Sequence, residues 1–226
     1  MENQQQQPQT TTSSEANVDA TSKELENMLS GELYNASDPL LVQMRNNARK
    51  LLRAYNQSTE EEKEKRTRII SELFLKAGEG TYMEPPFYCD YGRHISVGRN
   101  FYMNFNCVIL DCAHVDIGDN VLCGPNVQIY AATHPLEASV RILGPELARP
   151  IKIGNNVWLG GGAILCPGVT IGDNTTIGAG SVVTKDIPAN VLAAGNPCKV
   201  IKHLPEPPAE MAEERGEDGK ENNNNS

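Results

Sequence analysis

The sequence predicts a mainly β protein: a parallel β-helix with an N-terminal helical segment and one long excursion loop. Three observations predict this fold class. An apolar or sulfur-bearing residue returns every six positions in runs between residues 97 and 183. Apolar residues recur at spacings of three and four between residues 23 and 76, and the six-residue period breaks once, for about twenty residues. The first pattern is typical of β-helix coils and the second of amphipathic helices.

The helical segment comes first in the chain. Its apolar residues form three short stripes with helical spacing, over residues 25–29, 40–55 and 69–74. Asp38-Pro39 suits a helix N-cap followed by proline at the first helical position. Residues 58–61 (Ser-Thr-Glu-Glu) resemble a capping box and predict the start of the third helix. Such short helices need a larger partner, so we expect residues 23–78 to cap the β-helix. For the basic residues of the second helix, a solvated face is the favoured interpretation over an anion site (Arg45, Arg49, Lys50, Arg53).

The six-residue period defines the β-helix itself, over residues 79–204. One such unit is a short strand plus a tight turn, and glycine or Asn/Asp accepts the dihedral angles of the corner. Three units close one coil, and stacked coils pair strand to strand. Twelve apolar repeat positions are in phase (Val97, Met103, Ile109, Ile117, Cys123, Ile129, Ile153, Leu159, Leu165, Ile171, Ile177, Val183).

The period breaks between Ile129 and Ile151. Solenoids carry such insertions as loops on one face, often the working face. This loop contains Thr133-His134-Pro135, and it is the first place to look for chemistry.

The formal net charge of −9 comes mostly from the two ends of the chain. Residues 1–22 carry three acidic and no basic residues, and residues 205–226 carry seven acidic and two basic ones. Both stretches lack apolar residues for a core, so we expect two disordered tails, the second one acidic. The remaining segment is nearly neutral and has no basic stripe, which argues against a nucleic-acid binder. Neither a secretory signal nor an apolar run of 18 residues is present, so we expect no membrane span.

Six cysteines suggest disulfides only by their even number. Cys107, Cys123 and Cys166 lie in apolar runs, and no Cys-x-x-Cys pair occurs. We therefore expect reduced thiols, a cytoplasmic protein and no structural zinc.

Several segments together resemble the maltose/galactoside O-acetyltransferase family of hexapeptide-repeat acyltransferases. The resemblance covers residues 23–204 and is carried by segments in the helical front, the repeats and the loop (30–34, 84–92, 100–106, 132–135, 153–161, 183–188, 195–201). It implies that the β-helix is left-handed and that the protein is a homotrimer with active sites between neighbouring subunits. It also implies direct transfer of acetyl from acetyl-CoA to a sugar hydroxyl, with no metal.

The resemblance at Thr133-His134-Pro135 implies that His134 is the general base. A histidine side chain is largely neutral at physiological pH and can accept a proton from a hydroxyl group. Without the resemblance, a histidine in a loop is more simply a surface residue.

Other residues resemble the family's sugar-contacting positions (Asp38, Tyr102, Asn104, Asp111, Glu146). Asn104 and Asp111 carry groups that orient hydroxyls, and a hydrogen bond within a corner is their simpler role. Tyr102 has plain packing as its alternative, and Asp38 a helix cap. Galactoside-acetylating relatives are acidic at the position after Asp111, where this chain has Cys112. That departure favours a glucosyl or maltosyl acceptor.

For the acetyl-CoA side, the resemblance places Trp158 along the pantetheine arm, with packing between coils as its alternative. Peptide N–H groups in the glycine-rich corners would bind pantetheine amides or polarise the thioester carbonyl, and hydroxyl and ammonium groups further on would meet adenosine and phosphates. The first group is Gly160, Gly161 and Ala179, and the second is Thr184, Lys185, Lys199 and Lys202.

Three other functions compete with a sugar acetyltransferase. One is an acetyltransferase for another small acceptor, such as an antibiotic, serine or an aminosugar. The second is a zinc carbonic anhydrase, since His94, His114 and His134 are spaced by twenty, although the His-x4-His pair of that family is missing. The third is a trimeric scaffold without activity.

Overall fold

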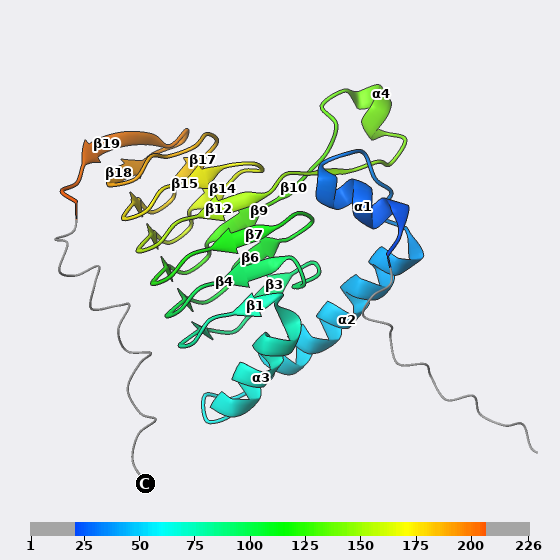
Figure 1. The fold of residues 1–226 in the computed structure, drawn as a ribbon, viewed down its shortest axis with the longest axis horizontal. Coiled ribbons are helices and arrows are strands. Elements are labelled where there is room, and N and C mark those ends of the chain that lie inside the picture. The colour runs from blue at the N-terminus through cyan, green and yellow to red at the C-terminus, as the bar shows by residue number, and fades with distance from the viewer. Residues whose placement is uncertain (1–20, 207–226) are drawn as a thin grey trace, which may run out of the picture.

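The computed structural model describes residues 21–206, and it begins with three helices at one end of the molecule (Figure 1). These are α1 (Lys23–Ser30), α2 (Pro39–Asn56) and α3 (Lys63–Leu73). The predicted start of α2 is confirmed: Asp38 Oδ1 accepts hydrogen bonds from the N–H groups of Leu40 and Leu41. The N-cap of α1 is Ser22, whose Oγ accepts from the N–H of Leu25 at 3.1 Å. The rest of the two predicted tails, residues 1–20 and 207–226, lies outside the described residues.

The predicted start of α3 is wrong by a few residues. Only one of the two hydrogen bonds of a capping box forms: the Glu62 carboxylate accepts from the N–H of Thr59. The helix itself begins at Lys63. Ser58 is instead buried under Arg66, whose Nε donates to Ser58 Oγ at 2.8 Å. The hydroxyl that would cap the helix is occupied as an acceptor for a buried guanidinium.

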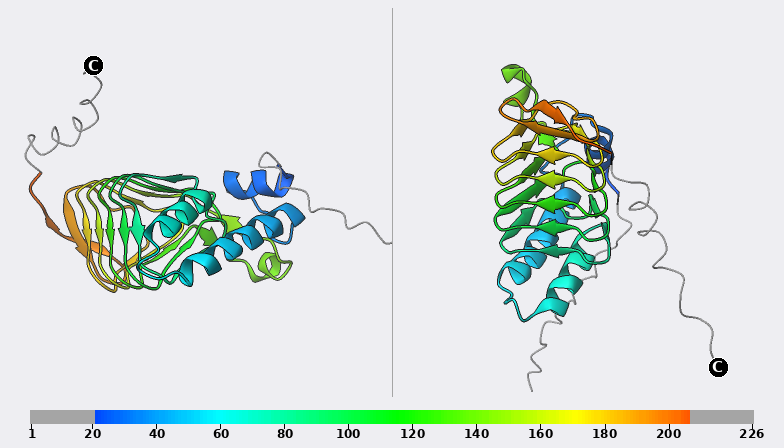
Figure 2. Two further views of the ribbon diagram at one scale, coloured as in Figure 1. Left: turned by 90° about the horizontal axis from the view of Figure 1, so that it is seen from below. Right: turned by 90° about the vertical axis from the view of Figure 1, so that its left-hand side faces the viewer.

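Three parallel sheets form the faces of a prism in the described part of the chain (Figure 2). The first sheet holds β1 (Lys76–Ala77), β4 (Ile95–Val97), β7 (Val115–Ile117), β12 (Ile151–Ile153) and β15 (Thr170–Ile171). The second holds β2 (Tyr82–Met83), β5 (Tyr102–Met103), β8 (Leu122–Cys123), β13 (Trp158–Leu159), β16 (Thr176–Ile177) and β18 (Val191–Ala194), closed by the antiparallel β19 (Lys199–His203). The third holds β3 (Phe87–Cys89), β6 (Cys107–Leu110), β9 (Gln128–Tyr130), β14 (Ile164–Leu165) and β17 (Val182–Val183). The chain visits the first, second and third sheet in turn, so the predicted fold class is confirmed.

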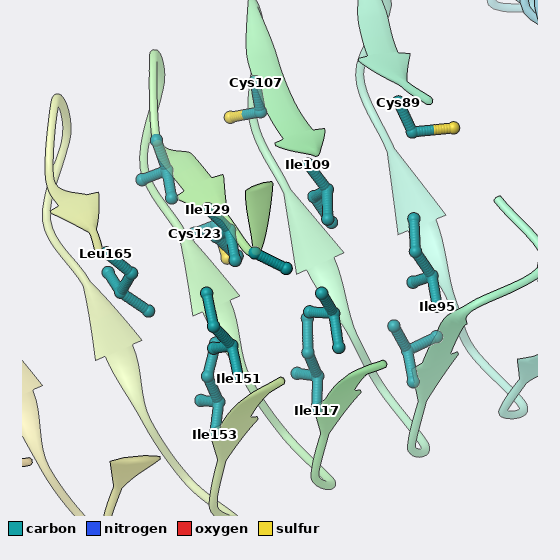
Figure 3. Packing of buried hydrophobic residues seen from close by; sticks show 14 of the residues in the cluster. Cys89, Ile95, Cys107, Ile109, Ile117, Cys123, Ile129, Ile151, Ile153 and Leu165 are labelled. Carbon is teal, nitrogen blue, oxygen red and sulfur yellow. The ribbon is translucent and has the colours of Figure 1, made fainter. Parts of the chain in front are cut away.

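The predicted repeat positions lie in the core of the prism. All twelve are at most 5% exposed, and strand neighbours such as Ile109 and Ile129 stack coil upon coil (Figure 3). Between the first and second sheets, five asparagines turn the corner with φ of 54–57° (Asn100, Asn120, Asn156, Asn174, Asn190). Their side-chain amides bond to one another in a ladder along the prism, with donor–acceptor distances of 2.8–3.1 Å. Asparagine tolerates this left-handed conformation better than most residues.

The predicted excursion loop leaves the corner between the third and first sheets. We call residues 131–150 the arm. It contains β10 (Ala132–Thr133), the short helix α4 (Ala138–Arg141) and β11 (Leu147–Ala148), and β10 pairs antiparallel with β11. Figure 1 shows that the arm extends away from the prism past α1.

Candidate active site

His134 lies on the arm, directly after β10, and its side chain is exposed. The ring has no hydrogen-bond partner within residues 21–206. Its buried neighbour Pro135 and the β10–β11 pair hold the backbone on both sides of this position. The imidazole is therefore presented by an ordered segment and is open to a ligand.

A polar cluster joins the helices to the base of the arm. We call Tyr34, Asp90, Cys112 and Glu146 the junction cluster. The hydroxyl of Tyr34 donates to Glu146 Oε2 at 2.9 Å, and the thiol of Cys112 donates to Asp90 Oδ2 at 3.4 Å. Burial raises the pKa of Asp90, opposed by the Cys112 hydrogen bond and the charge of Arg45. Burial also raises the pKa values of Cys112 and Tyr34, so both remain protonated hydrogen-bond donors.

Arg45 belongs to the same region, which corrects its interpretation as a residue on a solvated helix face. Its guanidinium donates to the hydroxyl of Tyr91 at 2.8 Å and to the carbonyl of Ala36 at 2.6 Å. Arg45 and Asp90 were not among the predicted site residues. Their side-chain partners, Tyr91 and Cys112, lie 46 and 22 positions away, so spacing carries no signal for them. Asp90 stands inside one of the segments that resemble the family.

Asp111 does not contact a ligand directly in this geometry, which corrects its predicted role. The side chain is 0% exposed, and its Oδ1 accepts from the N–H groups of Asp90 and Tyr91 at 3.0 and 2.9 Å. Burial raises its pKa to about 7, although the N–H of Tyr91 favours the charged form. Asp111 therefore anchors the turn that presents Asp90.

The sugar contact of Asp38 stays a prediction, and the structure shows its helix cap. Both α2 N–H donors and the hydroxyl of Ser22 use Asp38 Oδ1. The helix cap is therefore formed, and Oδ2 of Asp38 has no hydrogen-bond partner within the described residues. Glu146, by contrast, lies in the junction cluster at the base of the arm.

Tyr102, Asn104 and Trp158 are separated from the arm by the third sheet. Tyr102 and Trp158 project from the second sheet on either side of Leu122, in register. Trp158 is 54% exposed, so it is not packed between coils of its own chain. Asn104 follows β5 in the corner between the second and third sheets. Its Oδ1 accepts from the N–H of Phe105 at 2.7 Å, and its Nδ2 has no partner within the described residues.

The same corner brings Gly160, Gly161 and Ala179 together on successive coils. A side chain at Gly160 would lie 2.5 Å from the N of Ala179, so only glycine permits this approach. The N–H of Gly160 donates to the carbonyl of Ile177. Those of Gly161 and Ala179 have no acceptor within residues 21–206. Two peptide donors are thus available to a ligand at this corner.

The predicted phosphate-binding residues divide into two groups. Lys199 and Lys202 lie on β19, paired with Ala194 and Leu192 of β18, and belong to the second sheet with Trp158. Thr184 and Lys185 follow β17 at the corner between the third and first sheets, which is also the corner that the arm leaves. All four are exposed.

The site residues therefore form two sets on one chain. His134, Glu146, Thr184 and Lys185 belong to one corner of the prism. Asn104, Gly161 and Ala179 belong to the corner on the other side of the third sheet, and Trp158 lies on the adjoining second sheet. Each set has open hydrogen-bonding groups.

Comparisons with known proteins match this architecture. Residues 27–78 match the family model described as the maltose acetyltransferase hexapeptide capping motif, and residues 150–185 match the bacterial transferase hexapeptide repeat. The chain is 48% identical to the galactoside O-acetyltransferase of Escherichia coli, over 79% of this chain and 88% of that protein. The crystal structure of a maltose O-acetyltransferase from Clostridium difficile is 54% identical, with a TM-score of 0.80 over 81% of this chain and 98% of that one.

The chain belongs to the maltose/galactoside O-acetyltransferase family. It is thus an acetyltransferase, and the resemblance drawn from its sequence is confirmed. A galactoside acetyltransferase whose structure contains coenzyme A is 46% identical, with a TM-score of 0.79 over 82% of this chain and 92% of that one.

The histidines of this family member do not gather into a metal centre. The rings of His94 and His114 lie edge to face with centroids 5.8 Å apart, whereas His134 lies on the arm. His94 donates from Nδ1 to the carbonyl of Asp111 at 2.7 Å, and burial lowers its pKa to about 4. Within residues 21–206, no group of three or more His, Cys, Asp or Glu residues is arranged to hold a metal ion.

A depression on the outer face of the first sheet, around Lys76, Asp116 and Lys152, contains none of the predicted site residues, and the open groups described above lie elsewhere.

No helix in the described part of the chain has the length and apolar character needed to cross a membrane.

Proposed function

We propose that this protein transfers the acetyl group of acetyl-CoA to a hydroxyl group of a sugar, with His134 as the general base. The names of the relatives, which include maltose and galactoside O-acetyltransferases, support this class of acceptor. The observation that carries the proposal is the exposed His134 ring, presented by an ordered arm and without a protein partner.

The reaction is direct attack within a ternary complex. The sugar oxygen forms a bond to the thioester carbonyl carbon while His134 takes the hydroxyl proton. The C–S bond then breaks, and the CoA thiolate leaves with the proton returned from the imidazolium. The open N–H groups of Gly161 and Ala179 are suited to stabilise negative charge on the carbonyl oxygen or to bind the pantetheine amides.

We propose that the active site lies between chains of a homotrimer, with His134 from one subunit and Asn104 and Trp158 from its neighbour. The separation of the two sets across the third sheet supports this arrangement. The indole of Trp158 offers a flat surface to the pantetheine arm, and the ammonium groups of Lys199 and Lys202 on the same sheet offer charges to phosphates. Light scattering should give a mass of about three chains.

For the acceptor, we propose a glucosyl or maltosyl sugar rather than a galactoside. The position after Asp111 is the neutral Cys112, whose thiol is engaged by Asp90. The free Nδ2 of Asn104 and the carboxylate of Asp90 provide a donor and an acceptor for hydroxyl groups. All six cysteines are free thiols, which supports a reducing compartment such as the cytoplasm.

The test is a thiol-release assay with acetyl-CoA and a panel of mono- and disaccharides, with serine, an aminosugar and an aminoglycoside as competing acceptors. His134→Ala should lower kcat by ~10²–10⁴-fold while the fold and the mass in solution stay unchanged. His203→Ala, at an exposed position on β19, is the matched control. Near-normal turnover in His134→Ala would remove His134 as the base. Faster transfer to a non-sugar would replace the proposed acceptor class.

A further inference from the structure

A short antiparallel bridge fastens the helical segment to the base of the arm. Tyr34, in the connection between α1 and α2, exchanges two backbone hydrogen bonds with Glu146, with N–O distances of 3.1 and 3.0 Å. The hydroxyl of Tyr34 adds a third bond, to Glu146 Oε2 at 2.9 Å. Tyr34 is 1% exposed, and Glu146 is half-buried.

This bridge leads to His134 in a few steps. Glu146 directly precedes β11, and β11 pairs with β10 through Ala132–Ala148 and Thr133–Leu147. His134 is the next residue after β10. Any tilt of β11 relative to α1 is therefore carried by the strand pair to the imidazole.

The far end of the arm has little support from its own chain. The large apolar residues of the tip, Leu136, Ile142 and Leu143, are 79–89% exposed. The direction of the arm is therefore set at its base, where the helices and the prism meet.

Packing alone does not require the hydroxyl group of Tyr34. A phenylalanine would fill the same volume, but it would leave the Glu146 carboxylate without this donor. Because burial raises the pKa of Tyr34, the phenol stays protonated and donates throughout the neutral range. The side-chain bond fixes the Glu146 carboxylate as well as its backbone.

We infer that Tyr34 is a positioning residue for acetyl transfer: through Glu146 and the β10–β11 pair, it sets the position of the His134 imidazole. This inference rests on the proposed function of His134. It gives the helical segment a part in the reaction. A small displacement of a general base lowers the rate without preventing substrate binding.

The test compares Tyr34→Phe and Glu146→Gln with Tyr55→Phe. Tyr55 is a matched control: it is also buried in the helical segment, and its hydroxyl donates to the carbonyl of Met83 in the first coil, not to the arm. We expect Tyr34→Phe to lower kcat about tenfold or more, with little change in the KM for acetyl-CoA. Tyr55→Phe should keep wild-type kcat even if it lowers the melting temperature as much.

Amide hydrogen exchange gives a readout that does not depend on activity. In Tyr34→Phe, exchange should become faster at Ala132 and Thr133 and stay unchanged in the coils around Ile109. A kcat within twofold of wild type and unchanged exchange in the arm would overturn the inference. A rise in the KM for sugar in Glu146→Gln, with unchanged exchange, would also overturn it by making Glu146 a direct sugar contact. If the wild type acetylates no sugar, the proposed function fails, and the exchange experiment still decides whether Tyr34 holds the arm.

Discussion

Asn104 and His134 lie at different corners of one prism, with the third sheet between them. Asn104 follows β5 at the corner toward β6, and His134 stands on the arm that leaves the corner after β9. Each residue has polar groups that the described part of its own chain leaves open. This separation is the basis of the proposed site between two copies of the chain.

Trp158 should affect acetyl-CoA binding and not folding. Its side chain is 54% exposed on β13, so Trp158→Ala leaves no cavity in the prism. Loss of aromatic contact with the pantetheine arm should raise the KM for acetyl-CoA about tenfold. Leu159→Ala, one residue along but buried, should instead lower the free energy of unfolding by about 2–5 kcal/mol. A large loss of stability in Trp158→Ala with an unchanged KM would restore the interpretation of Trp158 as a packing residue.

Charge reversal at Lys185 and Lys202 should weaken acetyl-CoA binding more than sugar binding. Lys202 lies on β19 of the second sheet and Lys185 at the corner between the third and first sheets, so in the proposed trimer they meet the same CoA across an interface. Each reversal should raise the KM for acetyl-CoA, by about tenfold for the pair at low ionic strength, and the effect should shrink with added salt. Lys50→Glu, on the exposed face of α2, is the control for net charge. A change in the KM for sugar alone would show that these lysines do not bind CoA.

His94 should make the fold acid-sensitive. Burial lowers its pKa from 6.5 to about 4, so between these values the unfolded chain binds a proton that the folded chain excludes. The free energy of unfolding should therefore fall as the pH drops from 6.5 to about 4, by up to roughly 3 kcal/mol from this group. Urea unfolding of wild type and His94→Gln over this range measures it. A slope that is the same in both proteins would assign the acid sensitivity to other residues.

Asn120 should stabilise the corner between the first and second sheets in two ways. Its backbone has φ of 54°, and its side chain bonds to Asn100 at 3.0 Å and to Asn156 at 3.1 Å. Asn120→Gly keeps the backbone conformation and loses the ladder, which should destabilise the fold by about 1–2 kcal/mol. Asn120→Ala also strains the backbone and should cost about 1 kcal/mol more. Equal losses of unfolding free energy in both variants would mean that the left-handed backbone conformation of Asn120 does not affect stability.

The β-helical prism could be predicted from the sequence because its core residues recur with a regular period. Positions such as Ile109, Ile129 and Leu165 are buried for the same reason that they recur: each faces the axis once per strand. The arm could be located for a related reason, since an interruption of a regular period is visible without knowing what the inserted residues do.

The junction cluster could not be predicted in this way. Tyr34 and Glu146 lie 112 positions apart, and no periodicity links them. The role of Asp111 as the anchor of a turn could not be seen either. The sequence does not distinguish a carboxylate that anchors a turn from one that binds a sugar. For Asp38, local hydrogen bonds confirm the helix cap that the sequence offered as one interpretation.

Subunit mixing tests the shared active site most directly. His134→Ala and Asn104→Ala are each expected to be nearly inactive, and the two chains are co-expressed in equal amounts and purified as mixed oligomers. If each site takes His134 from one chain and Asn104 from its neighbour, random mixing should restore about a quarter of wild-type sugar acetylation. Activity no higher than that of the two variants measured alone would contradict the account, because it would place His134 and Asn104 in the same site of a single chain.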